Sequence, residues 1–279
     1  MRISHFTPAH ITGFFSIENN PDPLINGSCG AGFLLDKGVE STVRDSSEFK
    51  INVNRGSDIV INEVLKHFDA DKSFEIIQDI QVPIGAGFGT SAASALSLAI
   101  ALNEFLDFNH SYIECGQIAH KVDIALGGGL GDVIAQTGSG IVLRTSPGAP
   151  GIGKIESFDD EFFIATKTFG EISTASVITN PEHKKLISSN GRECLSKFKR
   201  NPSVDNFLRL SLEFSQNTKL MSDEVKNLVD YLNSSSDISG ASMAMLGNTA
   251  FAFADNESSF KDLKIEGLDI YKLYTRDKL

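Results

Sequence analysis

Three glycines alternate with other residues in the stretch 83–94, which reads PIGAGFGTSAAS. Glycine buries little surface and is costly to order, so a chain seldom gathers such residues only to build a core. The alternation in residues 73–82 predicts a strand before the stretch. The Ala- and Leu-rich residues 91–106 predict a buried helix after it. A strand, a glycine-rich turn and a helix N-terminus together favour an anion site.

Which phosphate-bearing ligand such a site would take is less obvious from this stretch alone. No Gly-Lys-Ser/Thr follows the glycines, so the stretch is not a Walker A loop. Residues 87–92 match the loose dinucleotide pattern, but that pattern expects an acidic residue about 20 positions later, at the end of a second strand. Asp107 comes too early and directly follows the helix. Thr90 and Ser91 supply hydroxyls for phosphate oxygens or for Mg²⁺.

A second glycine cluster, GGGLGDVIAQTGSG at residues 127–140, carries a single carboxylate, Asp132. Nine residues earlier, Asp123 lies on a helix predicted over residues 111–126. Two carboxylates beside a phosphate loop suit chemistry with Mg-ATP. One acid can hold Mg²⁺, and the other can orient or deprotonate an attacking hydroxyl.

Composition excludes several classes of partner. The net charge of -11 argues against nucleic acid or an anionic membrane surface, which both require clustered Lys and Arg. The three cysteines lie far apart, which indicates a reducing compartment and no zinc site. Neither a signal peptide nor a long apolar run is visible, so we expect a cytoplasmic protein.

The clearest break in composition is TSPGAPGIGK at residues 145–154. It predicts an N-terminal ATP-binding domain over 1–150 and a C-terminal domain over 151–279. In the second part we expect strands at 162–169 and 249–254 and helices at 174–189 and 203–232. The chain is therefore predicted to be α+β.

Residues 83–93 resemble the central motif of the GHMP kinases, the superfamily of galactokinase, homoserine kinase and mevalonate kinase, with Thr90 in place of the first serine. GGGLGD is similar to the acidic loop of that family, and residues 239–252 are loosely similar to its late glycine motif. The resemblance implies a GHMP kinase fold, with a ribosomal-protein-S5-like N-terminal domain and a ferredoxin-like C-terminal domain. It also implies that the ATP phosphates bind to Pro83, Gly85, Ala86, Gly87, Phe88, Gly89, Thr90, Ser91 and Ala92.

Three further segments, 6–17 (FTPAHITGFFSI), 22–32 (DPLINGSCGAG) and 131–151, resemble the archaeal pantoate kinases. The resemblance implies ATP-dependent phosphorylation of (R)-pantoate to (R)-4-phosphopantoate in coenzyme A biosynthesis. It also implies a homodimer, which is usual for the family.

On this interpretation Mg²⁺ would be held by Ser91 and Asp123, with Thr90 as a second hydroxyl candidate. Asp132 would orient the substrate hydroxyl or accept its proton. Contacts to the substrate are expected from His10, Thr12, Ser28 and Arg144, of which Arg144 would bind the carboxylate. The gem-dimethyl group of the substrate would contact Phe14 and Phe15.

Three other functions remain open at this point. A GHMP kinase for another small compound, of the homoserine or mevalonate type, is one; Thr12 argues against sugars and mevalonate, because many sugar kinases of the superfamily have Asp there. A metabolite sensor with the same fold but no turnover is the second. A nicotinamide-dependent oxidoreductase is the third.

Overall fold

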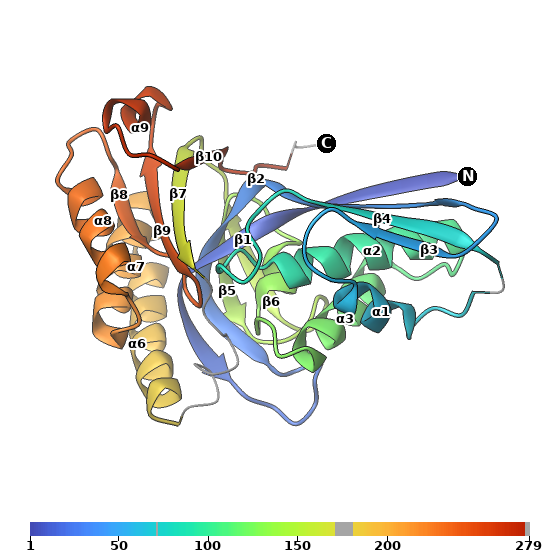
Figure 1. Ribbon diagram of the computed structural model, residues 1–279. Helices are drawn as coiled ribbons and strands as arrows, with labels where there is room; N and C mark the ends of the chain where they lie inside the picture. Colours follow the sequence, from blue (N-terminus) through green and yellow to red (C-terminus); the bar gives the residue numbers. More distant parts are fainter. Residues whose placement is uncertain (71, 171–180, 277–279) are drawn as a thin grey trace.

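The computed structural model describes residues 1–70, 72–170 and 181–276, which form two β-sheets with helices packed on them (Figure 1). The first sheet has the order β3-β4-β2-β5-β6, and β1 pairs with β2. The strands of this sheet are β1 (Arg2–Glu18), β2 (Gly27–Asp45), β3 (Lys50–Val53), β4 (Phe74–Ile80), β5 (Ile141–Ser146) and β6 (Lys154–Phe158). Its helices are α1 (Ile59–Leu65), α2 (Thr90–Leu106), α3 (Tyr112–Ala125) and α4 (Asp132–Ala135).

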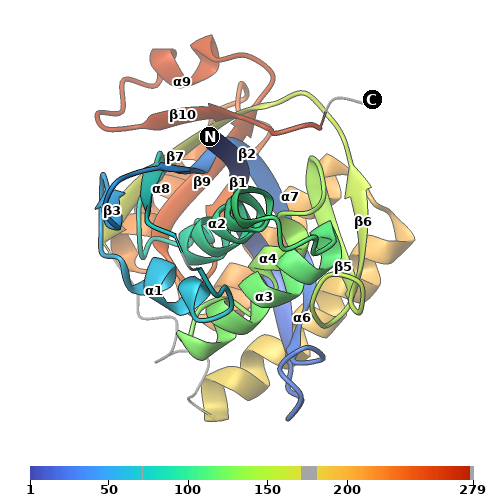
Figure 2. The same ribbon diagram turned by 90° about the vertical axis from the view of Figure 1, so that its right-hand side faces the viewer.

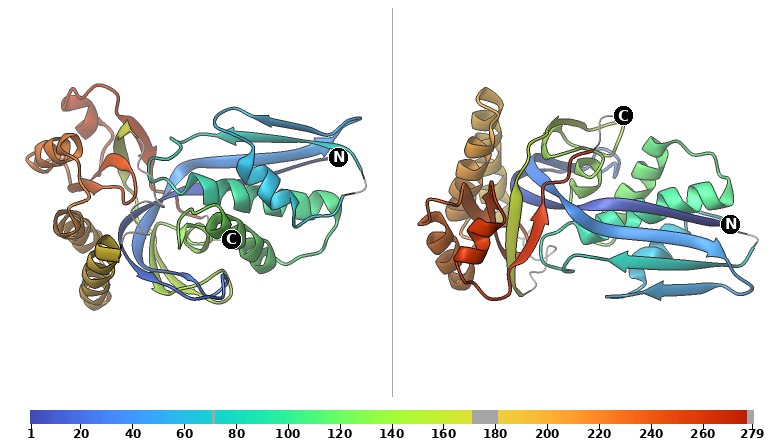
Figure 3. Two further views of the ribbon diagram at one scale, coloured as in Figure 1. Left: turned by 60° about the horizontal axis from the view of Figure 1, so that its bottom comes forward. Right: turned by 90° about the horizontal axis from the view of Figure 1, so that it is seen from above.

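The second sheet is antiparallel and has the order β10-β7-β9-β8. Helices α6, α7 and α8 lie on its outer side in Figure 1, and the same layering is visible in both views of Figure 3. Along the chain, one strand is followed by helices, two strands, a further helix and a last strand. This β-α-β-β-α-β order is typical of a ferredoxin-like domain, which the sequence led us to expect. The elements are β7 (Phe163–Gly170), α6 (Pro181–Arg200), α7 (Val204–Thr218), α8 (Asp223–Asn233), β8 (Gly240–Met243), β9 (Asn248–Ala254), α9 (Ser258–Asp262) and β10 (Asp269–Lys272).

Two expected helices differ from those observed. The helix expected over 203–232 is two helices, because Lys219 ends α7 with a left-handed φ of 55° and Ser222 caps α8 through its side chain. Part of the helix expected over 174–189 lies outside the described residues; the described part continues to Arg200. The expected strands at 73–82, 162–169 and 249–254 are confirmed within a few residues.

Helix α2 is buried along most of its length, as the sequence predicts. Its Ala and Ser side chains allow it to lie close to β1 and β2, and α1 and α3 lie beside it (Figure 2). Polar groups in this layer are paired: Ser97 bonds Ser41 at 2.7 Å, and Ser94 donates to Gln78 at 2.8 Å. The helix N-terminus is thereby held at the end of the glycine stretch.

The two sheets share one hydrophobic core. The Phe33 ring lies 5.0 Å from the Phe251 ring and 4.8 Å from the Phe253 ring, which joins β2 to β9. The expected boundary near residue 150 falls between β5 and β6, yet β6 pairs with β5, so the first sheet extends to Phe158. Within the described chain, no helix combines the length and apolar character needed to cross a bilayer.

Candidate active site

The glycine stretch forms a loop whose backbone alternates in handedness. Gly85, Gly87 and Gly89 have φ values of 69°, 86° and 58°. Residues with a Cβ rarely adopt this region of backbone conformation. Successive N–H groups in such alternating conformations turn toward one concave side. Gly89 is also the N-cap of α2, so the free N–H groups and positive dipole end of that helix lie at the same place. The loop is therefore suited to bind phosphates.

Two neighbouring segments hold this loop in place. The pairing of β1 with β2 shifts register between Pro8 and His10 and again between Thr12 and Phe14. Such bulges free backbone groups of a strand for other partners. The amide of His10 donates to the Phe88 carbonyl at 3.0 Å, and the Thr12 carbonyl accepts from the Met245 amide at 3.0 Å. Strand β1 thus contacts both the phosphate loop and the segment between β8 and β9.

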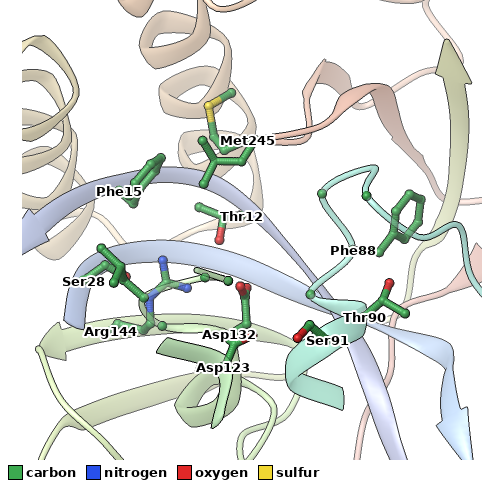
Figure 4. Close-up of a pocket in the computed structure, with 18 of the residues that line it drawn as sticks. Thr12, Phe15, Ser28, Phe88, Thr90, Ser91, Asp123, Asp132, Arg144 and Met245 are labelled. Atoms are coloured by element: carbon green, nitrogen blue, oxygen red, sulfur yellow. The ribbon is translucent and has the colours of Figure 1, made fainter. Parts of the chain in front are cut away.

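The Thr90 hydroxyl closes the loop on itself. It donates to the Pro83 carbonyl at 3.0 Å, and Thr90 is buried. The neighbouring Ser91 hydroxyl instead lies beside Asp123 at the cavity (Figure 4). Of the two expected hydroxyl ligands, Ser91 is the better placed to reach a ligand.

The glycines before Asp132 provide room for two carboxylates. A Cβ on Gly128 would lie 2.1 Å from Oδ1 of Asp123, and a Cβ on Gly129 would lie 1.7 Å from Oδ2 of Asp132. Real Cβ atoms do not approach that closely, so any larger residue would displace an acid. The glycine run therefore allows the loop backbone to pass directly over both acids.

Asp123 is a buried carboxylate with no hydrogen-bond partner for either oxygen within the described residues. Burial raises its pKa well above the usual range, and the charge of Asp132 adds to this, while the nearby Ser91 hydroxyl offsets a part. An unpaired buried carboxylate is costly unless a cation balances it. Among the described residues no group of three or more His, Cys, Asp or Glu could hold a metal by itself. The donors instead suit Mg²⁺, which is commonly held by one or two carboxylates plus substrate phosphates.

Asp132 has the opposite environment. Burial raises its pKa, but the hydrogen bond from His10 and the positive charge of Arg144 outweigh this, and the pKa lies below the usual range. Oδ1 of Asp132 lies 2.6 Å from Nδ1 of His10. Asp132 therefore stays ionised and acts as an acceptor at the cavity.

Arg144 lies on β5 and is almost fully buried, with 1% of its surface exposed. Its Nη1 contacts Nε2 of His10 at 3.2 Å, and its Nε has no partner within the described residues. Burial lowers the pKa of Arg144, while the charge of Asp132 raises it. Arginine nevertheless keeps its charge in proteins. Figure 4 shows the side chain next to Ser28, on the same side of the cavity as Asp132.

The opposite side of the cavity is apolar. Phe15 and Met245 lie across from Arg144 and Ser28, with Thr12 between them and Asp132 (Figure 4). Leu130 and Leu246 also line the cavity. Phe14, in contrast, is fully buried against Phe198 and Phe207 and contacts only the core.

Most residues predicted for the site line one cavity. They are Thr12, Ser28, Gly85, Gly87, Phe88, Gly89, Thr90, Ser91, Asp123, Asp132 and Arg144. Pro83, Ala86 and Ala92 do not line the cavity: Pro83 accepts the Thr90 hydrogen bond through its carbonyl, and Ala86 and Ala92 are buried. His10, expected at the substrate, is fully buried and does not line the cavity, because its ring packs behind Asp132.

The sequence left some lining residues unassigned. Met245 and Leu246 belong to the loosely matched motif at 239–252, whose few glycines gave a weak signal. His120 was also missed: its Nε2 lies 3.0 Å from the carbonyls of Pro23 and Asn26, and so holds the loop before Ser28. His120 is one helical turn before Asp123 on α3, a spacing that could have indicated a shared role.

Comparison with known proteins finds relatives over most of the chain. Residues 55–140 match the family described as GHMP kinases N terminal domain. The chain is 38% identical to the pantoate kinase of Methanocaldococcus jannaschii, over 91% of this chain and 93% of that protein. It is 32% identical to the pantoate kinase of Thermococcus kodakarensis, over 99% and 97% of the two chains.

Solved structures agree with the fold. A phosphotransferase related to the CoA biosynthesis pathway superposes with a TM-score of 0.86 at 29% identity, over 99% of this chain and 97% of that one. The Methanococcus jannaschii mevalonate kinase superposes with a TM-score of 0.71 at 16% identity, over 99% and 98%, and shows the fold alone. Each of the two pantoate kinases is more than 30% identical to this chain over most of both lengths, and the fold is shared. This chain therefore belongs to the pantoate kinase family of GHMP kinases.

Proposed function

We propose that this protein transfers the γ-phosphoryl group of ATP to the primary hydroxyl of (R)-pantoate. One observation carries the choice of substrate: a buried Arg144, whose Nε has no partner among the described residues, shares the cavity with Asp132 and the phosphate loop. Such an arginine favours a hydroxy acid over a neutral alcohol. The curated relatives named above are pantoate kinases, which supports the same substrate.

ATP binds with its phosphates on the N–H groups of the loop 85–91 and at the N-terminus of α2. Ser91 and Asp123 would hold Mg²⁺ next to them, and an ion bound there would supply positive charge to balance that of the phosphates. The net charge of -11 is no obstacle, because the attraction is local and comes from backbone dipoles.

Pantoate binds with its carboxylate on Arg144, beside the Ser28 hydroxyl. Its two methyl groups face Phe15 and Met245 on the apolar side. This orientation directs the primary hydroxyl toward Asp132, and the enzyme gains rate mainly by holding hydroxyl and phosphate in line.

In the transfer, the hydroxyl oxygen forms a bond to the γ-phosphorus. The bond from that phosphorus to the oxygen bridging to the β-phosphate breaks, and ADP leaves with the electron pair. The hydroxyl proton passes to Asp132 as the new bond forms and later to solvent. Because phosphoryl transfer has a loose transition state, orientation by Asp132 matters as much as basicity.

The test is ADP release with Mg-ATP against pantoate, pantothenate, homoserine and mevalonate. We expect turnover with pantoate alone. Turnover with homoserine or mevalonate instead would keep the kinase and replace the substrate. Bound ATP without turnover on any of the four would favour a sensor.

A cytoplasmic location fits the use of ATP and the three free, buried cysteines, Cys29, Cys115 and Cys194. The homodimer expected from the family resemblance is tested by light scattering on the purified protein.

A further inference from the structure

The imidazole of His10 lies between the two charged groups of the site. Its Nδ1 is 2.6 Å from Oδ1 of Asp132, and its Nε2 is 3.2 Å from Nη1 of Arg144. The residue is fully buried, so water does not reach either nitrogen. Its two ring nitrogens therefore have defined protein partners.

The partners determine where the proton lies. A guanidinium can only donate, so Nε2 of His10 must be unprotonated and accept from Arg144. The remaining proton is then on Nδ1 and is donated to Asp132. Burial lowers the pKa of His10; the hydrogen bond to Asp132 and its charge raise it, and the charge of Arg144 lowers it, with a net decrease. A neutral ring agrees with the geometry.

The fold gives this ring its position. A Cβ on Gly32 would lie 2.3 Å from Nε2 of His10, so β2 has a glycine where the ring passes. The register shift after Pro8 sets the direction of His10, whose amide also binds the phosphate loop at Phe88. A single residue of β1 thus contacts the loop through its backbone and Asp132 through its side chain.

We propose that His10 is a positioning residue, which occupies Oδ1 of Asp132 and leaves Oδ2 for the substrate hydroxyl. It also joins Asp132 to Arg144, the residue that binds the substrate carboxylate. The inference rests on the role of Asp132 in the proposed function. The sequence suggested a direct substrate contact for His10; the geometry points to an action through Asp132.

Two substitutions separate the roles of the two ring nitrogens of His10. The amide nitrogen of Asn can occupy the place of Nδ1, so His10→Asn keeps a donor to Asp132. The longer Gln side chain reaches the place of Nε2, so His10→Gln keeps a contact to Arg144 and loses the donor. We expect kcat to fall about 10- to 100-fold in His10→Gln, with KM for ATP nearly unchanged. The loss of kcat in His10→Asn should be several-fold smaller.

The matched control is His5→Gln on the same strand, where the ring is partly exposed and pairs with Glu104. It should leave kcat unchanged. Equal loss of kcat in His10→Asn and His10→Gln, or no loss in His10→Gln, would overturn the proposal.

A measurement on the unsubstituted protein covers the case in which a variant does not fold. Nitrogen-15 NMR of histidine-labelled protein, with the His10 ring assigned by through-bond correlation, reports the tautomer directly. We expect a neutral ring protonated on Nδ1 at neutral pH; a proton on Nε2 would contradict the proposal. The spectrum needs no substrate, so it is independent of whether pantoate is the acceptor.

Discussion

Asp123 and Asp132 are two carboxylates in one cavity whose pKa values are shifted in opposite directions. Burial and the charge of Asp132 raise the pKa of Asp123, whereas His10 and Arg144 outweigh burial and lower that of Asp132. Opposite shifts in neighbouring acids separate their roles. The lowered pKa favours the anionic form of Asp132, which can accept a hydrogen bond, and the raised pKa favours the protonated form of Asp123 unless a cation lies beside it.

Replacing Asp123 tests the cation. A raised pKa means that the folded state binds the proton more tightly, so this group destabilises the fold as pH rises above its unfolded value of about 3.9. At pH 7 without Mg²⁺ we expect Asp123→Asn to unfold at a higher temperature than the parent. Added Mg²⁺ should raise the Tm of the parent and not that of the variant.

The control for that experiment is Asp69→Asn, at an exposed position. It should leave both the Tm and its response to Mg²⁺ as in the parent. If Mg²⁺ does not change the Tm of the parent protein, with or without ATP, Asp123 does not bind the metal.

Asp132→Asn keeps the shape of the side chain and removes its charge. We expect turnover to fall by about 10²- to 10⁴-fold, because the substrate hydroxyl loses its acceptor. ATP binding, measured by calorimetry, should stay within a few-fold, since the phosphate loop is untouched. Near-normal turnover would exclude Asp132 from the mechanism.

At the scale of elements, the phosphate loop is held by the start of β9 and by the glycine that precedes it. The Thr249 hydroxyl donates to the Ala86 carbonyl at 2.9 Å, and a Cβ on Gly247 would lie 1.9 Å from the same oxygen. The C-terminal sheet therefore packs directly against the glycine-rich loop at the cavity. This contact explains why a glycine is needed at 247, far along the chain from the loop.

Gly247→Ala should displace the loop and raise KM for ATP about 10-fold or more, because roughly 1.4 kcal/mol of lost binding corresponds to a factor of 10. Gly240→Ala is the matched control in the same domain, where a Cβ would meet the Leu208 side chain at 3.0 Å and not the loop. Both variants should lose stability, and only Gly247→Ala should change KM for ATP. The same KM for ATP in the two variants would show that the contact of Gly247 with Ala86 does not determine the position of the loop.

At the scale of the whole molecule, the two sheets are joined by packing and by backbone hydrogen bonds. Besides the phenylalanine contacts across the core, the end of the chain returns to the first sheet: the Tyr274 amide donates to the Leu34 carbonyl at 2.9 Å, and the Gly140 amide donates to the Tyr274 carbonyl at 2.7 Å. The cavity lies where the two sheets meet. The residues that line it from the first sheet and those before β9 are therefore held in a fixed relation.

Phe33→Ala should reduce the free energy of unfolding by about 3–5 kcal/mol, the range for a buried Phe reduced to Ala. Because its ring packs on both β9 and α7, calorimetry should show a single transition at lower temperature. Phe33→Leu, which retains most of the apolar volume, should lose less. Two separate transitions, with only one shifted, would mean that the sheets unfold independently.

Local patterns in the chain determined much of what the structure shows. Alternating glycines between a strand and a helix allow the positive φ values found at Gly85, Gly87 and Gly89, so the local sequence predicts a loop whose N–H groups can face an anion. The helices around 91–106 and 111–126 follow from local propensity and capping, and the cavity residues Ser91, Asp123 and Asp132 are close in sequence to the glycines that make room for them.

Tertiary structure decided the rest. His10 and Arg144 are 134 positions apart, and their contact depends on the pairing of β1 with β2 and of β2 with β5. The burial that raises the pKa of Asp123, the His10 and Arg144 interactions that lower that of Asp132, and the close approach of Gly247 to Ala86 likewise arise only when the two sheets pack together. A residue's type and neighbours in sequence predict what chemistry it can do, but its exposure and partners are properties of packing, which no local pattern specifies.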